Sequence, residues 1–168
     1  MPDLRYTRIE TPLREVTLVA EDDHLTGLYF PRQRPLPAAD EFGPRVDVHA
    51  DPVFTRTAAE LAEYFDGTRQ SFGVPLRARG DDFAERVWAL LRQIPYGTTT
   101  TYGAIATRLG HPGQAQRVGQ TVGRNPIGIL IPCHRVIGAD GSLTGYAGGL
   151  DRKRRLLDLE EPADTRLF

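Results

Sequence analysis

Residues 127–136 read Ile-Gly-Ile-Leu-Ile-Pro-Cys-His-Arg-Val and contain the only cysteine of the 168-residue chain. The apolar, β-branched run 127–131 is typical of a buried strand, and Pro132 cannot extend the hydrogen bonding of such a strand. We therefore expect Cys133 to lie where a strand gives way to a loop. His134, one of four histidines, follows it directly. A thiol presented there beside an imidazole is a candidate nucleophile.

A free cysteine is by residue type more often an inert core residue than a reactive one. Here His134 and Arg135 follow the cysteine, and positive neighbours favour the reactive thiolate. Consecutive residues of an extended chain point to opposite sides, so His134 is poorly placed for a direct hydrogen bond to Cys133. We expect a bridging water or a turn to connect them.

The preceding residues predict two short helices joined by a tight, glycine-containing turn. Thr100 or Thr101 caps the first helix, and residues 114–122 form the second. This is the helix-turn-helix pattern, in which the second helix approaches a DNA groove. Ala115 and Gly119 are small enough for close approach to a groove, and they suit helix packing equally well.

Charge is distributed unevenly along the chain. Residues 1–78 hold 9 arginines and 13 acids, net −4, whereas residues 79–168 hold 12 basic residues and 9 acids, net +3. No acid occurs between Arg86 and Ala139. The six arginines of that stretch are Arg86, Arg92, Arg108, Arg117, Arg124 and Arg135. Phosphate contacts supply most sequence-independent DNA affinity, so this stretch predicts a DNA-binding surface. The alternative is a solvated basic face without a partner.

The first 78 residues predict a small α/β domain without catalytic residues. The three strand candidates, connected by hairpins, cover 6–9, 16–20 and 25–30. Residues 31–50 are proline-rich and lack periodicity, which indicates a loop. Asp51 then caps a helix, whose apolar face is Phe54, Ala58, Leu61, Ala62 and Phe65.

Three further C-terminal elements are predicted. Asp81 or Asp82 caps a helix that runs to about Gln93, and residues 143–149 form a flexible, glycine-rich segment with one tyrosine. Asp151 caps a final helix through Leu159, with Glu160 at its end. An acid at a helix C-terminus is disfavoured by the helix dipole, so we expect a specific partner for Glu160; the alternative is an ordinary exposed glutamate.

Composition indicates a soluble globular protein, with 40% hydrophobic and 26% charged residues. The first twenty residues show no membrane or export segment. One cysteine excludes an intramolecular disulfide and fits a reducing, cytoplasmic location. It also leaves too few soft ligands for a structural zinc, and no phosphate-binding glycine loop is visible, so we expect neither metal nor cofactor.

The hexapeptide 131–136 resembles the active-site signature of the O6-alkylguanine-DNA alkyltransferases, also called methylated-DNA–protein-cysteine methyltransferases. Four further blocks resemble that family in the same order: residues 101–103, 123–126, 143–149 and 156–160. The resemblance implies a mixed α/β protein with two domains. Residues 1–78 would form a supporting α/β (ribonuclease H-like) domain, and residues 79–168 a mostly helical, winged helix-turn-helix-like domain that binds DNA and accepts the alkyl group.

The resemblance further implies a suicide DNA-repair enzyme. The alkylated O6 atom of guanine lies inside the duplex, so the nucleotide must be flipped out before a side chain can reach it. Cys133 would attack the alkyl carbon, while His134, through a water and oriented by Glu160, takes the thiol proton. Water cannot displace the resulting thioether, so each molecule acts once. The implied partner is double-stranded DNA with alkylated bases, including possible O4-alkylthymine; the protein would be a monomer in solution, with cooperative assembly on DNA left open.

Other roles also come from the resemblance. Tyr102 would crowd the 3′ phosphate and supply a proton to the departing guanine, and Asn125 would brace the cysteine loop; the alternatives are a packing tyrosine and a turn residue. The base pocket would consist of Tyr146, Ala147, Gly148 and Val136. The DNA-binding residues would be Thr101, Ala115, Gln116, Arg117, Gly119 and Arg124.

The sequence departs from the family at one position. Relatives carry an arginine finger nine residues before the asparagine of the Gly-x-Asn-Pro block, where this chain has Gln116, followed by Arg117. One helical step rotates a side chain by about 100°, so the two positions are not equivalent. We predict that Gln116 enters the base stack, with Arg117 as the alternative.

Two other classes of function compete with alkyl transfer. A non-catalytic lesion-binding module, like the alkyltransferase-like proteins, is disfavoured because those proteins lack the cysteine. A cysteine hydrolase is disfavoured because adjacent Cys133 and His134 fit a direct dyad poorly and no oxyanion-hole signature is visible.

Overall fold

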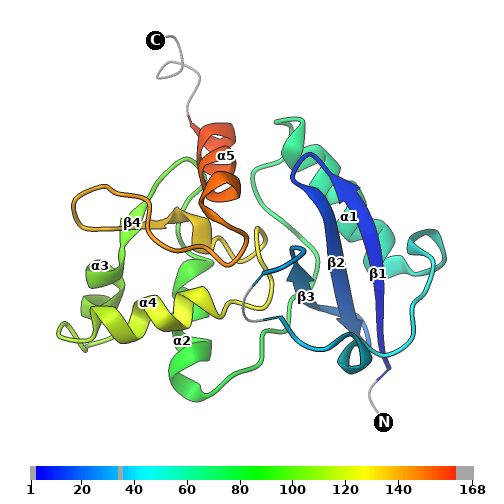
Figure 1. The fold of residues 1–168 in the computed structure, drawn as a ribbon, viewed down its shortest axis with the longest axis horizontal. Coiled ribbons are helices and arrows are strands. Elements are labelled where there is room, and N and C mark those ends of the chain that lie inside the picture. The colour runs from blue at the N-terminus through cyan, green and yellow to red at the C-terminus, as the bar shows by residue number, and fades with distance from the viewer. Residues whose placement is uncertain (1–2, 34–35, 162–168) are drawn as a thin grey trace. The chain divides into compact units, whose positions relative to one another are not determined.

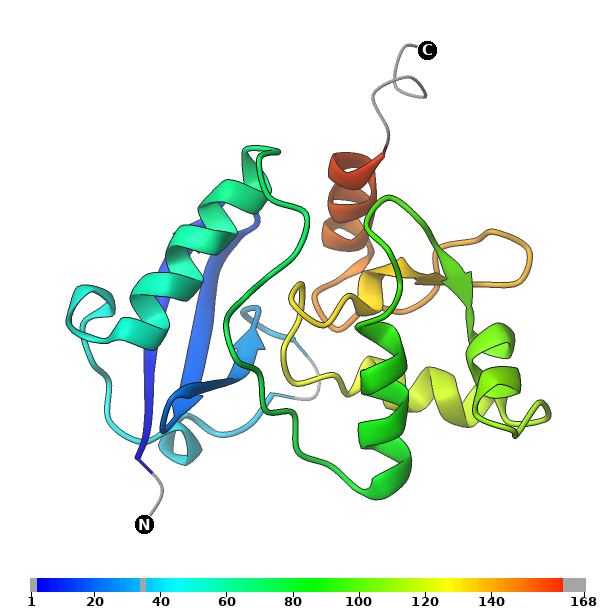
Figure 2. The ribbon, with the colours of Figure 1, turned by 180° about the vertical axis from the view of Figure 1, so that it is seen from behind.

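The computed structural model describes residues 3–33 and 36–161. The chain forms two compact units. The N-terminal unit extends to Arg79 and includes Pro126–Gly128, and the C-terminal unit contains Gly80–Asn125 and the chain from Ile129 onward. Both units are visible in Figure 1 and, from behind, in Figure 2.

The N-terminal unit is built on a three-stranded antiparallel sheet in the order β1-β2-β3. The strands are β1 (Leu4–Thr11), β2 (Arg14–Glu21) and β3 (His24–Tyr29). Leu18 in the central strand pairs with Thr7 on one side and Leu28 on the other, and both leucines are fully buried. The three predicted strands and their hairpin connections are confirmed.

The helix α1 (Pro52–Phe65) lies along one face of this sheet (Figures 1 and 2). Asp51 caps it as predicted, because its carboxylate accepts hydrogen bonds from the first N–H groups of the helix. The same carboxylate pairs with the guanidinium of Arg5 on β1, at 2.6 and 3.2 Å. One aspartate therefore holds the helix start to the sheet.

Two details of this unit differ from the prediction. The buried face of α1 includes Tyr64, whereas Ala62 is exposed, because the helix turns a slightly different stripe toward the sheet. The segment expected to be a loop contains two short 3-10 turns, η1 (Ala39–Phe42) and η2 (Val48–Ala50).

The C-terminal unit is mostly helical, with a two-stranded parallel pair, β4 (Thr100–Thr101) with β5 (Val136–Ile137). Its helices are α2 (Asp82–Leu91), α3 (Tyr102–Arg108), α4 (Ala115–Gly123) and α5 (Leu150–Glu160). The Thr101 hydroxyl caps α3, and the buried Trp88 of α2 donates its indole N–H to the carbonyl of Thr121 on α4 at 3.0 Å. The helices α3 and α4 pack against each other as the predicted helix-turn-helix (Figure 2).

The strand predicted over residues 127–131 is wrong. Ile127 makes one isolated bridge to Leu28 inside the N-terminal unit, and the next three residues form a turn in which Ile129 has φ +70°. A β-branched residue adopts positive φ only under constraint. All five residues of the run are buried, as the pattern indicated, so burial rather than strand pairing explains its composition.

The predicted cap of the last helix is also wrong. The helix α5 begins at Leu150, and Gly149, with φ +93°, occupies the cap position without a side-chain hydrogen bond. Asp151 lies in the first turn instead, where a negative charge is favourable to the helix dipole.

Candidate active site

Cys133 opens η3 (Cys133–Arg135), a short 3-10 turn directly after Pro132. Its side chain is buried, with 6% of the residue exposed. The N–H of Cys133 donates to the carbonyl oxygen of Ile131 at 2.7 Å, and the Asn125 side-chain amide donates to the same oxygen at 2.8 Å. Asn125 thus connects the end of α4 to the backbone beside the cysteine.

The thiol is protonated at neutral pH. Burial raises the pKa of Cys133 to about 11, although a hydrogen bond from Asn125 and the charge of Lys153 act in the opposite direction. Since the thiolate is the nucleophilic form, the site requires a base that removes the proton as the sulfur reacts.

His134 and Glu160 form a fully buried pair, with Nε2 of the imidazole 2.7 Å from Oε2 of the carboxylate. Burial lowers the pKa of His134, and Glu160 only partly opposes this effect, so the imidazole is neutral at neutral pH. A carboxylate can only accept, so Nε2 carries the proton and Nδ1 keeps its lone pair. In the part of the chain that the structure describes, buried Nδ1 has no hydrogen-bond partner. It is available to accept a proton.

Arg135 is the third member of this buried group. Its Nε and Nη2 donate to the two oxygens of Glu160 at 2.8 and 3.0 Å, and its Nη1 donates to the carbonyl of Ile94 at 2.7 Å. Burial alone would raise the pKa of Glu160, but the hydrogen bonds and charges of His134 and Arg135 lower it to about 2. The acid at the end of α5 therefore has the specific partners that its position predicted.

The placement of Arg135 corrects one expectation. Only 6% of Arg135 is exposed, so it does not belong to the basic surface predicted from the acid-free stretch. The other five arginines of that stretch are exposed. Sequence alone could not separate the six, because which of them is buried depends on Glu160, 25 residues further along.

Lys153 is a buried site residue that the sequence analysis missed. It is fully buried on α5, and its Nζ donates to the carbonyls of Val136 at 2.6 Å and Thr144 at 2.7 Å. Burial lowers the pKa of its ammonium. The available signal was compositional, because this is the only lysine in a chain with 20 arginines.

Two tyrosines flank this region. Tyr102, the first residue of α3, is half-buried, and its hydroxyl oxygen accepts a hydrogen bond of 2.9 Å from Thr144. The Tyr146 hydroxyl is buried, and burial together with the nearby Cys133 raises the pKa of Tyr146 well above its ordinary value. Of the other predicted pocket residues, Val136 and Gly148 are buried and Ala147 is half-buried.

The predicted DNA-binding residues occupy α3 and α4. Thr101 caps α3, Ala115 and Gly119 are half-buried, and Arg124, the residue after α4, is exposed. Gln116 is exposed. The side chain of Arg117 is exposed, but it contacts two residues of its own unit. Its guanidinium carbon lies 3.8 Å from the centre of the Phe83 ring, and its Nη1 donates to the Gln114 side chain at 3.1 Å.

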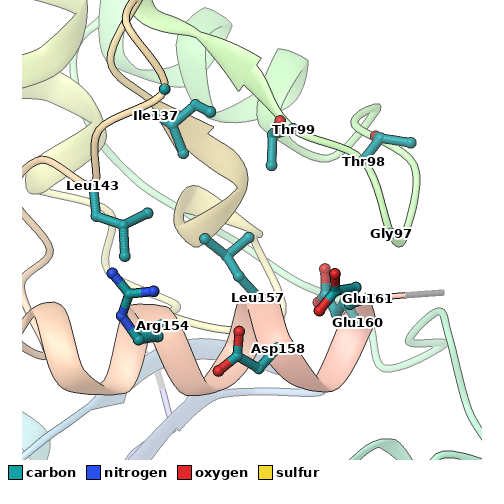
Figure 3. A pocket seen from close by; sticks show the side chains of 11 residues that line it. Gly97, Thr98, Thr99, Ile137, Leu143, Arg154, Leu157, Asp158, Glu160 and Glu161 are labelled. Atoms are coloured by element: carbon teal, nitrogen blue, oxygen red, sulfur yellow. The ribbon is translucent and has the colours of Figure 1, made fainter. Parts of the chain in front are cut away.

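A cavity of about 310 Å³ in the C-terminal unit shares Glu160 with the buried group of His134 and Arg135 (Figure 3). It is lined by Gly97, Thr98, Thr99, Ile137, Gly141, Leu143, Arg154, Leu157, Asp158, Glu160 and Glu161. Figure 3 shows Arg154, Leu157 and Asp158 on α5 facing Ile137 across it. Cys133 does not line this cavity, and neither do the four predicted pocket residues. Their role in base binding stays a prediction.

Among the described residues, no cluster of three or more histidine, cysteine or acidic side chains could hold a metal ion. No helix within residues 3–33 and 36–161 is both long and apolar enough to cross a membrane.

Two family models cover most of the chain. Residues 4–78 match the ribonuclease-like domain of 6-O-methylguanine DNA methyltransferase, and residues 82–162 match its DNA-binding domain. The chain belongs to this family. The resemblance seen in the signature hexapeptide is thereby confirmed, and so is the predicted fold class of a ribonuclease-like α/β unit with a helical, helix-turn-helix unit.

Individual relatives support the assignment to the methyltransferase family. The methylated-DNA–protein-cysteine methyltransferase of Mycobacterium tuberculosis is 45% identical, covering 98% of this chain and 99% of the relative. That of Methanosarcina acetivorans is 40% identical, covering 92% and 97%. A crystal structure of Mycobacterium tuberculosis OGT in complex with DNA matches with a TM-score of 0.84 and 44% identity, covering 96% of this chain and 98% of that one.

Proposed function

We propose that this protein repairs DNA by transferring the alkyl group of O6-alkylguanine to Cys133 in a single irreversible turnover. The observation that carries this proposal is the buried array behind the chain's only cysteine. The protonated thiol of Cys133 is followed in sequence by His134, whose neutral imidazole has no hydrogen-bond partner at Nδ1 among the described residues. The ionised carboxylate of Glu160 holds that imidazole through Nε2. This array removes a proton from sulfur and leaves the sulfur as the nucleophile.

The reaction balances with the groups present. The Cys133 sulfur forms a bond to the alkyl carbon while the bond from that carbon to guanine O6 breaks, and the electron pair of the broken bond stays with the guanine. The thiol proton passes through one water to Nδ1 of His134, which Glu160 holds. Tyr102 supplies a proton to the departing guanine. The product is a thioether, which water cannot displace at neutral pH, so each molecule acts once.

Duplex DNA is the partner of the helix-turn-helix, and the target nucleotide is flipped out of the duplex to reach the sulfur. Thr101, Ala115, Gly119 and Arg124 contact the DNA. Asn125 braces the cysteine loop, and the extruded base is received by Tyr146, Ala147, Gly148 and Val136. The N-terminal domain (1–78) supports the DNA-binding, alkyl-accepting domain (79–168). We further propose that the protein acts in the cytoplasm as a monomer in solution.

The decisive experiment is incubation with duplex DNA containing O6-methylguanine, followed by intact-protein and peptide mass measurement. Alkyl transfer predicts a stoichiometric gain of one methyl group on the peptide that contains Cys133. Retention on DNA without a mass change would instead identify a non-catalytic lesion-binding module, and multiple turnover of an ester would identify a hydrolase.

Gln116, rather than Arg117, is proposed as the side chain that fills the gap left by the flipped base. The support is the engagement of Arg117 with Phe83 and Gln114, which keeps that guanidinium on its own unit. Gln116→Ala is therefore expected to lower the transfer rate constant on duplex DNA about three- to tenfold, since it removes contacts that compensate for unstacking. Single-turnover kinetics on duplex and single-stranded DNA measure this difference.

Two comparisons make the Gln116 test specific. Gln116→Arg should speed transfer on duplex DNA, whereas Gln120→Arg, which adds the same charge one turn further along α4, should change only the salt-dependent affinity. An equal loss for Gln116→Ala on single-stranded DNA would contradict the assignment. A large duplex-specific loss in Arg117→Ala alone would favour Arg117 instead.

The transfer rate at saturating DNA is expected to be flat from pH 6.5 to about pH 10, and to fall only at a pH lower than 6.5. Between these limits the imidazole is neutral and the thiol is protonated, so the reactive protonation state does not change. Because burial lowers the pKa of His134 from its ordinary 6.5, the base is protonated only at a more acidic pH, where the rate should fall. Single-turnover rates with a circular dichroism check of folding at each pH provide the measurement. A tenfold rise per pH unit through pH 7–9 would show that a free thiolate reacts without the base.

A further inference from the structure

Thr144 is an exposed residue in the segment 143–149 whose side chain makes a long-range hydrogen bond. Its hydroxyl donates a hydrogen bond of 2.9 Å to the hydroxyl oxygen of Tyr102, 42 residues earlier in the chain. A tyrosine hydroxyl can swing about two side-chain torsions, and a bond to a fixed partner restricts it to one position.

Either hydroxyl of this pair can donate, because each carries a rotatable O–H. When Thr144 donates, the Tyr102 oxygen acts as acceptor and the phenol O–H serves another group. A hydroxyl that accepts one bond also becomes a better donor, because hydrogen bonds in a chain polarise one another. Giving a proton to the departing guanine is the role that the proposed reaction requires of Tyr102.

The backbone of Thr144 is itself held in place by Lys153. The buried ammonium donates to the carbonyl of Thr144 at 2.7 Å and to that of Val136 at 2.6 Å. Val136 follows η3 directly, so one side chain of α5 holds the strand after the cysteine and the segment that carries Thr144. A compact ammonium with three donors suits this narrow position better than a planar guanidinium.

We propose that Thr144 is a positioning residue for alkyl transfer, which orients the Tyr102 phenol through its hydroxyl and is anchored through its carbonyl by Lys153. This inference rests on the proposed function and deepens it. It predicts that the Thr144 hydroxyl contributes to the transfer step and not to DNA affinity, because its bond is made to a side chain of the protein.

The test uses Thr144→Val, which keeps the branched shape and removes the hydroxyl, and Thr144→Ser, which keeps the hydroxyl. Single-turnover kinetics with excess duplex containing O6-methylguanine separate the transfer rate constant at saturation from the DNA Kd. Thr144→Val should lower the rate constant about five- to tenfold, the effect of losing one hydrogen bond, and leave Kd within about twofold. Thr144→Ser should restore the rate to within about twofold of the unmodified protein.

A double-mutant cycle with Tyr102→Phe identifies the partner. Once the phenol hydroxyl is removed, Thr144→Val should cost nothing further. The matched control is Thr99→Val, an exposed threonine in the same unit, which should leave the rate unchanged. A full loss from Thr144→Val in the Tyr102→Phe background, or an unchanged rate for Thr144→Val alone, would overturn the inference while methylation of the unmodified protein still supports the proposed function. Absence of methyl transfer to the unmodified protein would overturn both.

Discussion

Replacing Cys133 by alanine is expected to lower alkyl transfer by more than about 10⁴-fold, to below detection, while leaving binding to DNA intact. No other thiol exists in the chain to take over the reaction. Cys133→Ser should be almost as inactive, because a hydroxyl is far harder to deprotonate than a thiol. Mass measurement after incubation with O6-methylguanine DNA reports transfer, and fluorescence anisotropy reports binding.

The DNA affinity of Cys133→Ala should remain within about twofold of the unmodified protein, because the sulfur is buried and the exposed arginines proposed to bind phosphate are unchanged. Stoichiometric methylation of any peptide in Cys133→Ala would show that another residue is the acceptor. A collapse of DNA affinity in this variant would show that the cysteine has a structural role in the DNA-binding surface.

Removing the charge of Glu160 is expected to have the second-largest effect, on both reactivity and stability. Glu160→Gln leaves the buried guanidinium of Arg135 without its counter-charge and no longer fixes the proton of His134 on Nε2. We expect the transfer rate constant to fall on the order of 10²- to 10³-fold, within the range of general-base catalysis. Breaking a buried ion pair from one side typically costs about 3–5 kcal/mol of unfolding free energy. Urea unfolding and single-turnover kinetics measure the two effects.

The neighbouring residue supplies the control for Glu160. Glu161 is exposed, and Glu161→Gln removes the same charge one position along, so it should change neither quantity measurably. The pH dependence gives a further check. The carboxyl pKa is about 2 in the folded protein against an ordinary 4.5, so its stabilising contribution is complete above about pH 4.5 and is lost as the pH falls toward 2. The stability gap between the unmodified protein and Glu160→Gln should therefore narrow over that window. A gap that stays constant across it would show that the ionised carboxylate is not what stabilises the fold.

Much of the fold could be predicted from the sequence because it depends on interactions between residues that are close along the chain. Asp51, Asp81 and Thr101 mark helix starts because a short polar side chain there accepts backbone N–H groups of the first turn, which is an interaction within a few residues. The hairpins of the N-terminal sheet are equally local. Cys133 was predicted as the candidate nucleophile from its neighbours and because it is the only cysteine in the chain.

The strand expected over residues 127–131 shows where local pattern fails. Apolar, β-branched composition reports burial, and a buried turn needs the same side chains as a buried strand. The positive φ of Ile129 is imposed by the surrounding packing and not by its own preference.

The protonation states and partners in the site were decided by tertiary structure alone. The imidazole of His134 is neutral because burial lowers its pKa, and Glu160, 26 residues later, fixes its tautomer. Arg135 pairs with Glu160, 25 residues later, and is therefore buried in an ion pair instead of being available to a phosphate. Lys153 binds two carbonyls that no local pattern connects to it. Residue type and order determined which functional groups were available for chemistry. Only folding determined how far these groups are shielded from water and how close they lie to one another, because both depend on residues far apart in the chain.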